Sequence, residues 1–226
     1  MKLALVGREL TKARALFAPY GKKFTFVETK PDIAVSYGGD GTLMLAEHWY
    51  PGVPKVFLRN SRIAKLAHAT DNQGVVAALA DKKFTIEERM KLDLVVKGVT
   101  LTGLNDIVIH NTDPRSAIRY EVCLNGKKCT SEIIGDGIVV STPLGSTAYY
   151  RSITDSYFET GIGLAFNNST EQADHIVLRE DRVIDMTLTR GTAHGYADNQ
   201  KKFVTLKVGD TARIKKSRHV ARLVVL

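Results

Sequence analysis

The sequence predicts an α/β N-terminal domain with a parallel, Rossmann-like sheet, followed by a β-rich C-terminal domain. Strand-like and helix-like segments alternate up to residue 80, the pattern of a parallel sheet with helices on its faces. From Phe84 onward the pattern changes to short apolar alternations broken by turns. No Gly/Ser linker or internal repeat separates the two parts, so we expect domains 1–82 and 83–226, with the last strand free to return to the first domain.

Each element follows from its local pattern. The N-terminal part should contain strands at 2–6, 23–28, 32–37 and 55–58, and helices at 8–17, 42–48 and 72–80. The C-terminal part should contain strands at 92–97, 100–110, 117–124, 127–132, 138–141, 175–178, 183–189, 204–208, 212–215 and 220–226.

Composition narrows the class of protein. The 226 residues are 44% hydrophobic and 25% charged, as in ordinary globular proteins, and no apolar run approaches the length of a membrane span. We therefore expect a cytoplasmic protein without membrane contact. The net charge of +8 comes from short Lys and Arg pairs and one denser segment, 215–219, without interleaved aromatic residues. Solvated surface is favoured over nucleic-acid binding, and the positive field would attract polyphosphate ligands.

The cysteines and histidines give no sign of a metal site. Cys123 and Cys129 flank Asn125-Gly126, a strong hairpin signal, which would put Cys129 opposite Val122 and Cys123 on the other face of the sheet. We expect no disulfide between them, and no metal held by a fixed protein site or thiol catalysis, because the six histidines are scattered along the chain.

The segment Gly38-Gly39-Asp40-Gly41-Thr42 lies between an expected strand and an expected helix. Glycines can adopt backbone angles that a Cβ forbids, so that N–H groups converge on an anion at the helix N-terminus. Asp40 would repel a phosphate there unless a metal ion or a substrate proton engages it. The alternative is a tight turn with an exposed aspartate.

Two segments of the β-rich part carry polar residues suited to a nucleotide. Asn105-Asp106 precedes an apolar strand and could bind a ribose diol or an adenine edge, although Asn-Asp before a strand is also a common turn. The second segment, 135–149, runs from Gly-flanked Asp136 through a buried strand into a small-residue turn. That turn should open a helix capped by Ser146 or Thr147, and the alternative is a strand and capped helix without a ligand.

Taken in order along the chain, these motifs resemble the NAD kinase family. The resemblance covers about residues 35–198, and its most specific motif is the run Asp-Gly-Ile-Val-Val-Ser-Thr-Pro-Leu-Gly-Ser-Thr-Ala-Tyr at 136–149. The Gly-Gly-Asp-Gly-Thr motif is also found in diacylglycerol and sphingosine kinases. The resemblance implies an NAD kinase-like fold, with an α/β phosphate-donor domain and a β-rich NAD-binding domain.

The implied activity is phosphoryl transfer from ATP, or from polyphosphate, to the 2′-hydroxyl of the adenosine ribose of NAD, giving NADP. Asp40 would be the general base, and Mg²⁺ would accompany ATP. The resemblance also implies a homodimer or homotetramer. The implied phosphate-binding residues are Gly38, Gly39, Gly41 and Thr42. The implied NAD-binding residues are Asp40, Gly41, Asn105, Asp106, Asp136, Thr147, Ala148, Tyr149, Ser152 and Asp198.

The chain departs from the family pattern at several positions. Family members usually carry Gly-x-Leu-Gly-Phe after the asparagine that corresponds to Asn60, whereas this chain has neither glycine there. Asp106 replaces the usual Glu, and Leu144 replaces Thr or Ser. Arg62 and Lys65 in the altered loop are open to two roles, phosphate contact or solvated surface.

Two other functions stay open at this level. A lipid or other small-molecule kinase sharing the Gly-Gly-Asp-Gly-Thr loop should show an apolar groove or patch. A dinucleotide-binding sensor without turnover would keep the same residues but form no NADP.

Overall fold

The computed structural model describes residues 1–62, 64–66, 68–128, 130–170 and 174–226. The chain divides into two units, one formed by Met1–Arg89 with Val220–Leu226 and the other by Met90–His219. The division falls inside two long strands, β5 (Thr85–Val96) and β17 (Thr211–Val225).

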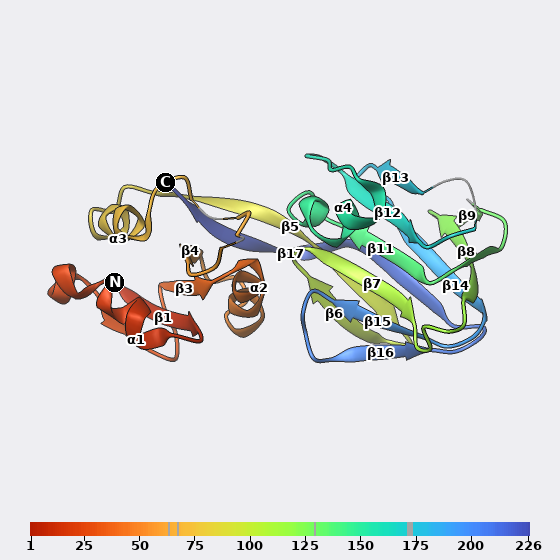
Figure 1. Ribbon diagram of the computed structural model, residues 1–226, viewed down its shortest axis with the longest axis horizontal. Coiled ribbons are helices and arrows are strands. Elements are labelled where there is room, and N and C mark those ends of the chain that lie inside the picture. Colours follow the sequence, from red (N-terminus) through yellow and green to blue (C-terminus); the bar gives the residue numbers. More distant parts are fainter. Residues whose placement is uncertain (63, 67, 129, 171–173) are drawn as a thin grey trace. The chain divides into compact units, whose positions relative to one another are not determined.

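The first unit is an α/β layer structure around a parallel sheet (Figure 1). The strand order is β2 (Thr25–Phe26), β1 (Lys2–Gly7), β3 (Ile33–Gly38) and β4 (Lys55–Arg59), and Leu223 of β17 pairs with Lys55 of β4, also in parallel. The helices are α1 (Leu10–Ala15), the 3₁₀ helix η1 (Ala18–Lys23), α2 (Asp40–Trp49) and α3 (Asn72–Ala80). The expected α/β class is confirmed.

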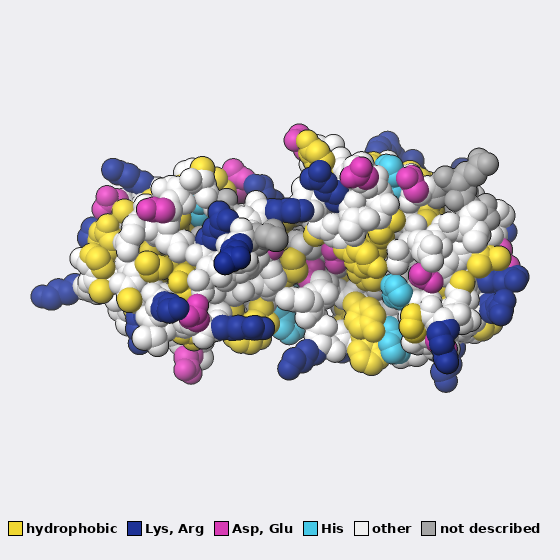
Figure 2. All heavy atoms as spheres, in the orientation of Figure 1, with side chains coloured by type: hydrophobic (Ala, Val, Ile, Leu, Met, Phe, Trp, Pro, Cys, Tyr) yellow, Lys and Arg dark blue, Asp and Glu magenta, His cyan; other side chains and the backbone are white. Residues whose placement is uncertain are grey.

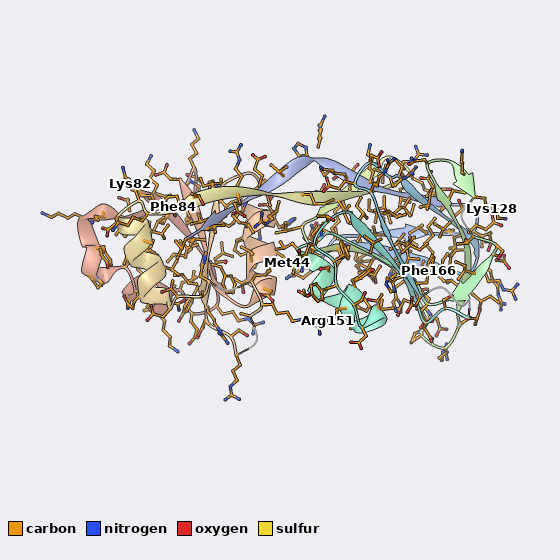
Figure 3. The ribbon with its side chains drawn as sticks, turned by 90° about the horizontal axis from the view of Figure 1, so that it is seen from above. Met44, Lys82, Phe84, Lys128, Arg151 and Phe166 are labelled. Carbon is orange, nitrogen blue, oxygen red and sulfur yellow. The ribbon has the colours of Figure 1, made fainter. Side chains whose placement is uncertain are left out.

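Apolar side chains of the strands and helices form the core of this unit. Val35 of β3, Leu58 of β4 and Leu79 of α3 are at most 1% exposed, and their burial supplies the main stabilisation. Phe84, which follows α3 and is labelled in Figure 3, packs against the same cluster.

A buried ion pair joins α2 to β4 in the first unit. The Lys55 ammonium contacts the Glu47 carboxylate and donates a hydrogen bond of 2.6 Å to the carbonyl of Tyr50. The two charged side chains are 0% and 3% exposed. Burying either charge alone would be strongly unfavourable, so each of the two residues depends on the other.

The second unit contains two antiparallel sheets packed face to face (Figure 1). In the first sheet, β10 (Ile133–Gly135), β8 (Ile118–Leu124), β14 (Ile184–Arg190) and β17 are neighbours in that order, and β5, β6 (Val99–Gly103) and β9 (Lys127–Lys128) pair alongside. The second sheet has the order β13 (His175–Leu178), β12 (Ile162–Asn167), β11 (Gly137–Ser141), β7 (Asp106–Asn111), β15 (Ala193–Ala197) and β16 (Phe203–Leu206). A 3₁₀ turn η2 (Gly145–Thr147) and helix α4 (Tyr149–Thr154) follow β11.

The core of the second unit lies between these sheets. It includes Leu94 of β5, Ile109 of β7 and Val140 of β11, all 0% exposed, together with Phe166 of β12, which is labelled in Figure 3. A smaller cluster on the other face of the second sheet joins Val139 to Tyr150 of α4. The β-rich character expected for the C-terminal part is confirmed.

Several strands differ from the sequence expectation. The expected strand at 100–110 is two strands, because β6 ends at Gly103 and β7 begins at Asp106. The expected strands at 212–215 and 220–226 belong to one continuous strand, β17.

Strands β12 and β15 were not expected, because each contains a glycine that weakens the strand pattern. A Cβ on Gly163 would lie 2.3 Å from the ring of Phe158, and one on Gly195 would lie 2.7 Å from a methyl group of Leu94. Close packing therefore requires both glycines inside the sheet.

The Asn125-Gly126 hairpin is confirmed. Both residues have positive φ, 51° and 75°, and Cys123 pairs with Lys128 across the turn. The expected place of Cys129 opposite Val122 lies outside the described residues. Among the described residues, no helix has the length and apolar character that spanning a bilayer requires.

Candidate active site

Asp40 is the first residue of helix α2, two residues after Gly38 at the carboxyl end of β3. Gly39 caps the helix with φ −107° and ψ −175°, an extended conformation that any residue can adopt. The expectation that this corner needs left-handed glycines is wrong, because Gly38, Gly39 and Gly41 have no positive φ. Gly38 is instead required because there is no room for a side chain, since a Cβ there would lie 2.2 Å from Oγ1 of Thr42.

The Asp40 carboxylate accepts two backbone hydrogen bonds from the altered loop after Asn60. The Lys65 amide lies 3.1 Å from Oδ2, and the Leu66 amide lies 3.2 Å from Oδ1. Each oxygen therefore keeps acceptor capacity for a further donor. The negative charge also lies at the N-terminus of a ten-residue helix, where the helix dipole stabilises it.

Asn105 and Asp106 lie where β6 gives way to β7 in the second unit, and both are buried, at 3% and 8% exposure. The main chain of Asn105 is held by the turn after β11, because its carbonyl accepts from the Thr142 amide at 2.8 Å. A Cβ on Gly145 would lie 2.3 Å from that same carbonyl oxygen, so this glycine permits the close approach. Within the described part of the chain, Oδ1 of Asn105 is buried and has no hydrogen-bond partner.

Asp198 holds the main chain of this corner. Its carboxylate accepts from the amides of Leu104, Asn105 and Asp106, at 2.7, 2.7 and 3.2 Å. Asp198 follows β15 with φ 50°, a left-handed conformation that aspartate tolerates better than most residues. These three bonds explain why the expected strand is interrupted, because the amides of Leu104 and Asn105 point to Asp198 instead of a neighbouring strand.

The pKa values of both carboxyl groups in this corner, those of Asp106 and Asp198, are raised. Burial, and then the charge of Asp198, raises the pKa of Asp106 from 3.8 to about 7. Burial also raises the pKa of Asp198, and the three amides that it accepts from oppose this increase. Asp106 is consequently able to donate or to accept a hydrogen bond near neutral pH.

Asp136 lies at the opposite end of the β7–β11 pair from Asp106. Gly137 pairs with His110, whereas Ser141 at the other end of β11 pairs with Asp106. The Asp136 carboxylate accepts from the side-chain amides of Asn111 and Asn168, each at 3.0 Å. The structure therefore does not bring Asp136 to the Asn105 corner.

The glycine after Asp136 has a steric reason. Gly137 has φ 135°, and a Cβ on it would lie 1.9 Å from the Ile109 carbonyl of the neighbouring strand.

The segment from Ser146 to Ser152 differs from the expected capped helix. Helix α4 begins after Ala148, without a side-chain cap, so Ser146 and Thr147 lie in η2 and are not its cap residues. The Ser146 hydroxyl instead lies within 2.9 Å of the carbonyls of Pro143 and Phe158. The two bonds connect the turn before α4 to the segment that leads into β12.

Two further predicted site residues lie in α4. Ser152 donates to the Tyr149 carbonyl at 2.7 Å, and the Tyr149 hydroxyl accepts from the amide of Asn167 at 3.1 Å. Tyr149 is 36% exposed, so part of its ring is available for contact with a ligand.

An aromatic cluster on the outer face of the second sheet was not predicted from the sequence. Figure 2 shows hydrophobic and histidine side chains gathered over β15 and β16. His194, Tyr196 and Phe203 form this cluster, with ring centroids 4.4 to 6.0 Å apart, and Phe203 is 46% exposed. Alternation along β15 and β16 is the sequence signal that could have found it.

The two units thus carry different parts of the predicted site. The first unit holds Asp40 with its glycines, and the second holds the Asn105 corner, the turn before α4 and Asp136. Among the described residues, no group of three or more His, Cys, Asp or Glu side chains is placed to hold a metal ion.

The chain combines a parallel α/β unit, in which Asp40 is the first residue of a helix, with a β-sandwich that carries a buried Asn-Asp corner, and the family model that it matches places it among the kinases. The family model described as the ATP-NAD kinase C-terminal domain matches residues 104–226, more than half of the chain. The chain therefore belongs to the NAD kinase family.

Individual relatives agree with this assignment. The NAD kinase of Methanoculleus marisnigri is 30% identical over 228 residues, which cover 97% of this chain and 84% of the relative. The NAD kinase of Bordetella avium is 30% identical over 210 residues, covering 85% and 70%.

Solved structures show the same fold. An NAD kinase from Archaeoglobus fulgidus in complex with ATP aligns with a TM-score of 0.80 at 20% identity, covering 99% of this chain and 93% of that one. A yeast NADH kinase complexed with NADH aligns with a TM-score of 0.86 at 15% identity, covering 100% and 83%. The expected NAD kinase-like fold is confirmed.

Proposed function

We propose that this protein transfers the γ-phosphoryl group of ATP, bound as its magnesium complex, to the 2′-hydroxyl of the adenosine ribose of NAD, giving NADP. Membership of the NAD kinase family supports the reaction class. The observation that carries the choice of acceptor is the buried Oδ1 of Asn105 beside Asp106, which has no hydrogen-bond partner among the described residues.

A buried acceptor without a donor costs about 1 to 3 kcal/mol, so Asn105 favours a ligand that donates a hydrogen bond. A ribose hydroxyl is such a donor. Asp106, with a pKa of about 7, can accept from or donate to the neighbouring hydroxyl of the same diol. We therefore assign the adenosine ribose to Asn105 and Asp106, and Asp198 supports the corner from the main-chain side.

Asp40 is proposed as the general base. The 2′-oxygen attacks the γ-phosphorus, the bond from that phosphorus to the bridging oxygen breaks, and ADP leaves. The proton of the 2′-hydroxyl passes to the Asp40 carboxylate, whose two oxygens each keep acceptor capacity beside the loop amides. Gly38, Gly39, Gly41 and Thr42 contact phosphate oxygens through the start of α2, so the first unit is the donor domain.

The rest of the dinucleotide is assigned to other parts of the second unit, the NAD-binding domain. The adenine side is formed by Thr147, Ala148, Tyr149 and Ser152, with the partly exposed Tyr149 ring available for stacking. Asp136, at the far end of β11, is assigned to the nicotinamide end. Asp106 and Asp136 lie at opposite ends of the β7–β11 pair, and this separation suits an elongated ligand that lies along the two strands.

The test is to incubate the purified protein with NAD, ATP and magnesium, and to follow NADP with an NADP-specific dehydrogenase. Asp40→Asn should lower kcat by roughly 10²- to 10⁴-fold while NAD still binds. Asp71→Asn is the matched control, because Asp71 caps another helix of the same unit by accepting from the Gly74 amide. If wild-type protein binds NAD but forms no more NADP than Asp40→Asn, the protein is a dinucleotide sensor and the proposal fails.

The donor and the assembly are separate parts of the proposal. Replacing ATP with inorganic polyphosphate in the same assay tests whether polyphosphate also serves as donor. The homodimer or homotetramer is tested by light scattering, and a monomeric mass would contradict it.

A further inference from the structure

Arg59, the last residue of β4, is held at both ends. Its main chain is fixed by Asn72 of α3, which accepts from the Arg59 amide and donates to the Arg59 carbonyl, both at 2.8 Å. Its guanidinium reaches the following loop, where Nε donates to the Ser61 carbonyl at 2.9 Å and Nη2 donates to the Arg62 carbonyl at 2.7 Å. One side chain therefore fixes the direction in which the chain leaves β4.

The same loop returns to Asp40 a few residues later. Its beginning is fixed to β3, because the Asn60 amide donates to the Gly38 carbonyl at 2.9 Å. Its later part supplies the Lys65 and Leu66 amides that bind the Asp40 carboxylate. The beginning and the later part of this loop therefore both lie beside the Gly38–Asp40 corner.

We propose that Arg59 is a positioning residue for Asp40, acting through the main chain of the loop that follows it. The inference rests on the proposed function in one respect, namely that Asp40 takes the proton. Fixing the Ser61 and Arg62 carbonyls limits where the Lys65 and Leu66 amides lie, and the carboxylate accepts from both of these amides. The carboxylate then keeps a constant orientation towards the hydroxyl that it deprotonates.

The geometry requires arginine. The guanidinium donates from Nε and Nη2 in a rigid fork, and it contacts two successive carbonyls at once. A lysine at this position keeps the positive charge but presents one flexible ammonium, which cannot fix both carbonyls in the same way. Arg59→Lys therefore keeps the positive charge and removes the fixed contact with both carbonyls, so that the two effects can be told apart.

The kinetic experiment compares Arg59→Lys and Arg59→Met with the wild type in the NADP assay. Because small misplacement of a catalytic group costs up to about 100-fold in rate, both variants should lose roughly 10- to 100-fold in kcat. KM for NAD should change less than about threefold, since its proposed contacts are elsewhere. Arg222→Met is the matched control, because Arg222 of β17 forms an exposed pair with Glu88, and the kcat of this variant should be unchanged. Wild-type kcat in Arg59→Lys would overturn the proposal.

A second measurement does not depend on activity. Hydrogen exchange of the Lys65 and Leu66 amides, followed by NMR, should accelerate at least about tenfold in Arg59→Met and in Asp40→Ala, and not in Arg222→Met. Unchanged exchange in Arg59→Met, with the thermal midpoint retained, would overturn the inference. If exchange accelerates in Arg59→Met but the wild type forms no NADP, the contact between Arg59 and the loop is supported and only the proposed function is refuted.

Discussion

Replacing Asp106 with asparagine should make the stability of this protein less sensitive to pH. Asp106 is 8% exposed, and burial together with the charge of Asp198 raises its pKa from 3.8 to about 7. Asparagine has nearly the same shape and carries no charge. The substitution therefore removes the titration while the packing of the corner is largely kept.

The direction in which stability changes with pH depends on whether the folded or the unfolded chain keeps the proton of Asp106. Below about pH 4 the carboxyl of Asp106 is protonated in both the folded and the unfolded chain. Between about pH 4 and pH 7 the unfolded chain releases the proton that the folded chain keeps, so wild-type stability falls by about 1.4 kcal/mol per pH unit. Above both pKa values the loss stays at about 4 kcal/mol.

The assay is thermal unfolding of wild type and Asp106→Asn, followed by circular dichroism at several pH values. From about pH 5 to about pH 8 the variant should gain about 2 to 3 kcal/mol relative to wild type, or roughly 5 to 10 °C in Tm. Asp181→Asn, at an exposed position, should show no such trend. A difference between Asp106→Asn and wild type that stays constant across this range would refute the reasoning.

Two other substitutions test the packing of each unit. Lys55→Met should destabilise by about 3 to 5 kcal/mol in urea unfolding, because Glu47 is left buried without its partner; adding Glu47→Leu should restore most of the loss, and no recovery would contradict the ion-pair argument. Gly145→Ala should lower stability by about 1 to 3 kcal/mol and weaken NAD binding, because its Cβ would push the Asn105 carbonyl. Gly21→Ala should change neither quantity, because a Cβ on Gly21 would have no atom of the described residues within 4 Å, and equal effects of the two variants would count against the close approach.

The alternation of elements in the first unit could be predicted from sequence because its signals are local. Apolar runs such as Ile33–Gly38 and the periodic segment Asn72–Ala80 carry their own patterns, and the structure has a strand and a helix there. Strands β12 and β15 could not be predicted in this way. Their glycines are explained only by the side chains of other elements packed against them.

The candidate site was likewise predictable from the sequence only in part. The motifs around Asp40, Asn105 and Asp136 identified a nucleotide-related chemistry from residue types and spacing. The sequence offered no means of predicting that Asp198 would bind three amides 92 to 94 residues earlier in the chain. It also gave no means of seeing that the altered loop would bind Asp40 through backbone amides.

By itself, the sequence determined the order of the α/β and β-rich parts, the NAD kinase family and the residue types available for chemistry. Only the tertiary structure decided which of those side chains are engaged and which are free. Asp198 is occupied by the main chain, Asn105 keeps a buried acceptor without a partner among the described residues, and Arg59 fixes the loop beside Asp40. The physical reason is that backbone donors and acceptors are the same at every residue, so their long-range pairing leaves no mark in the sequence.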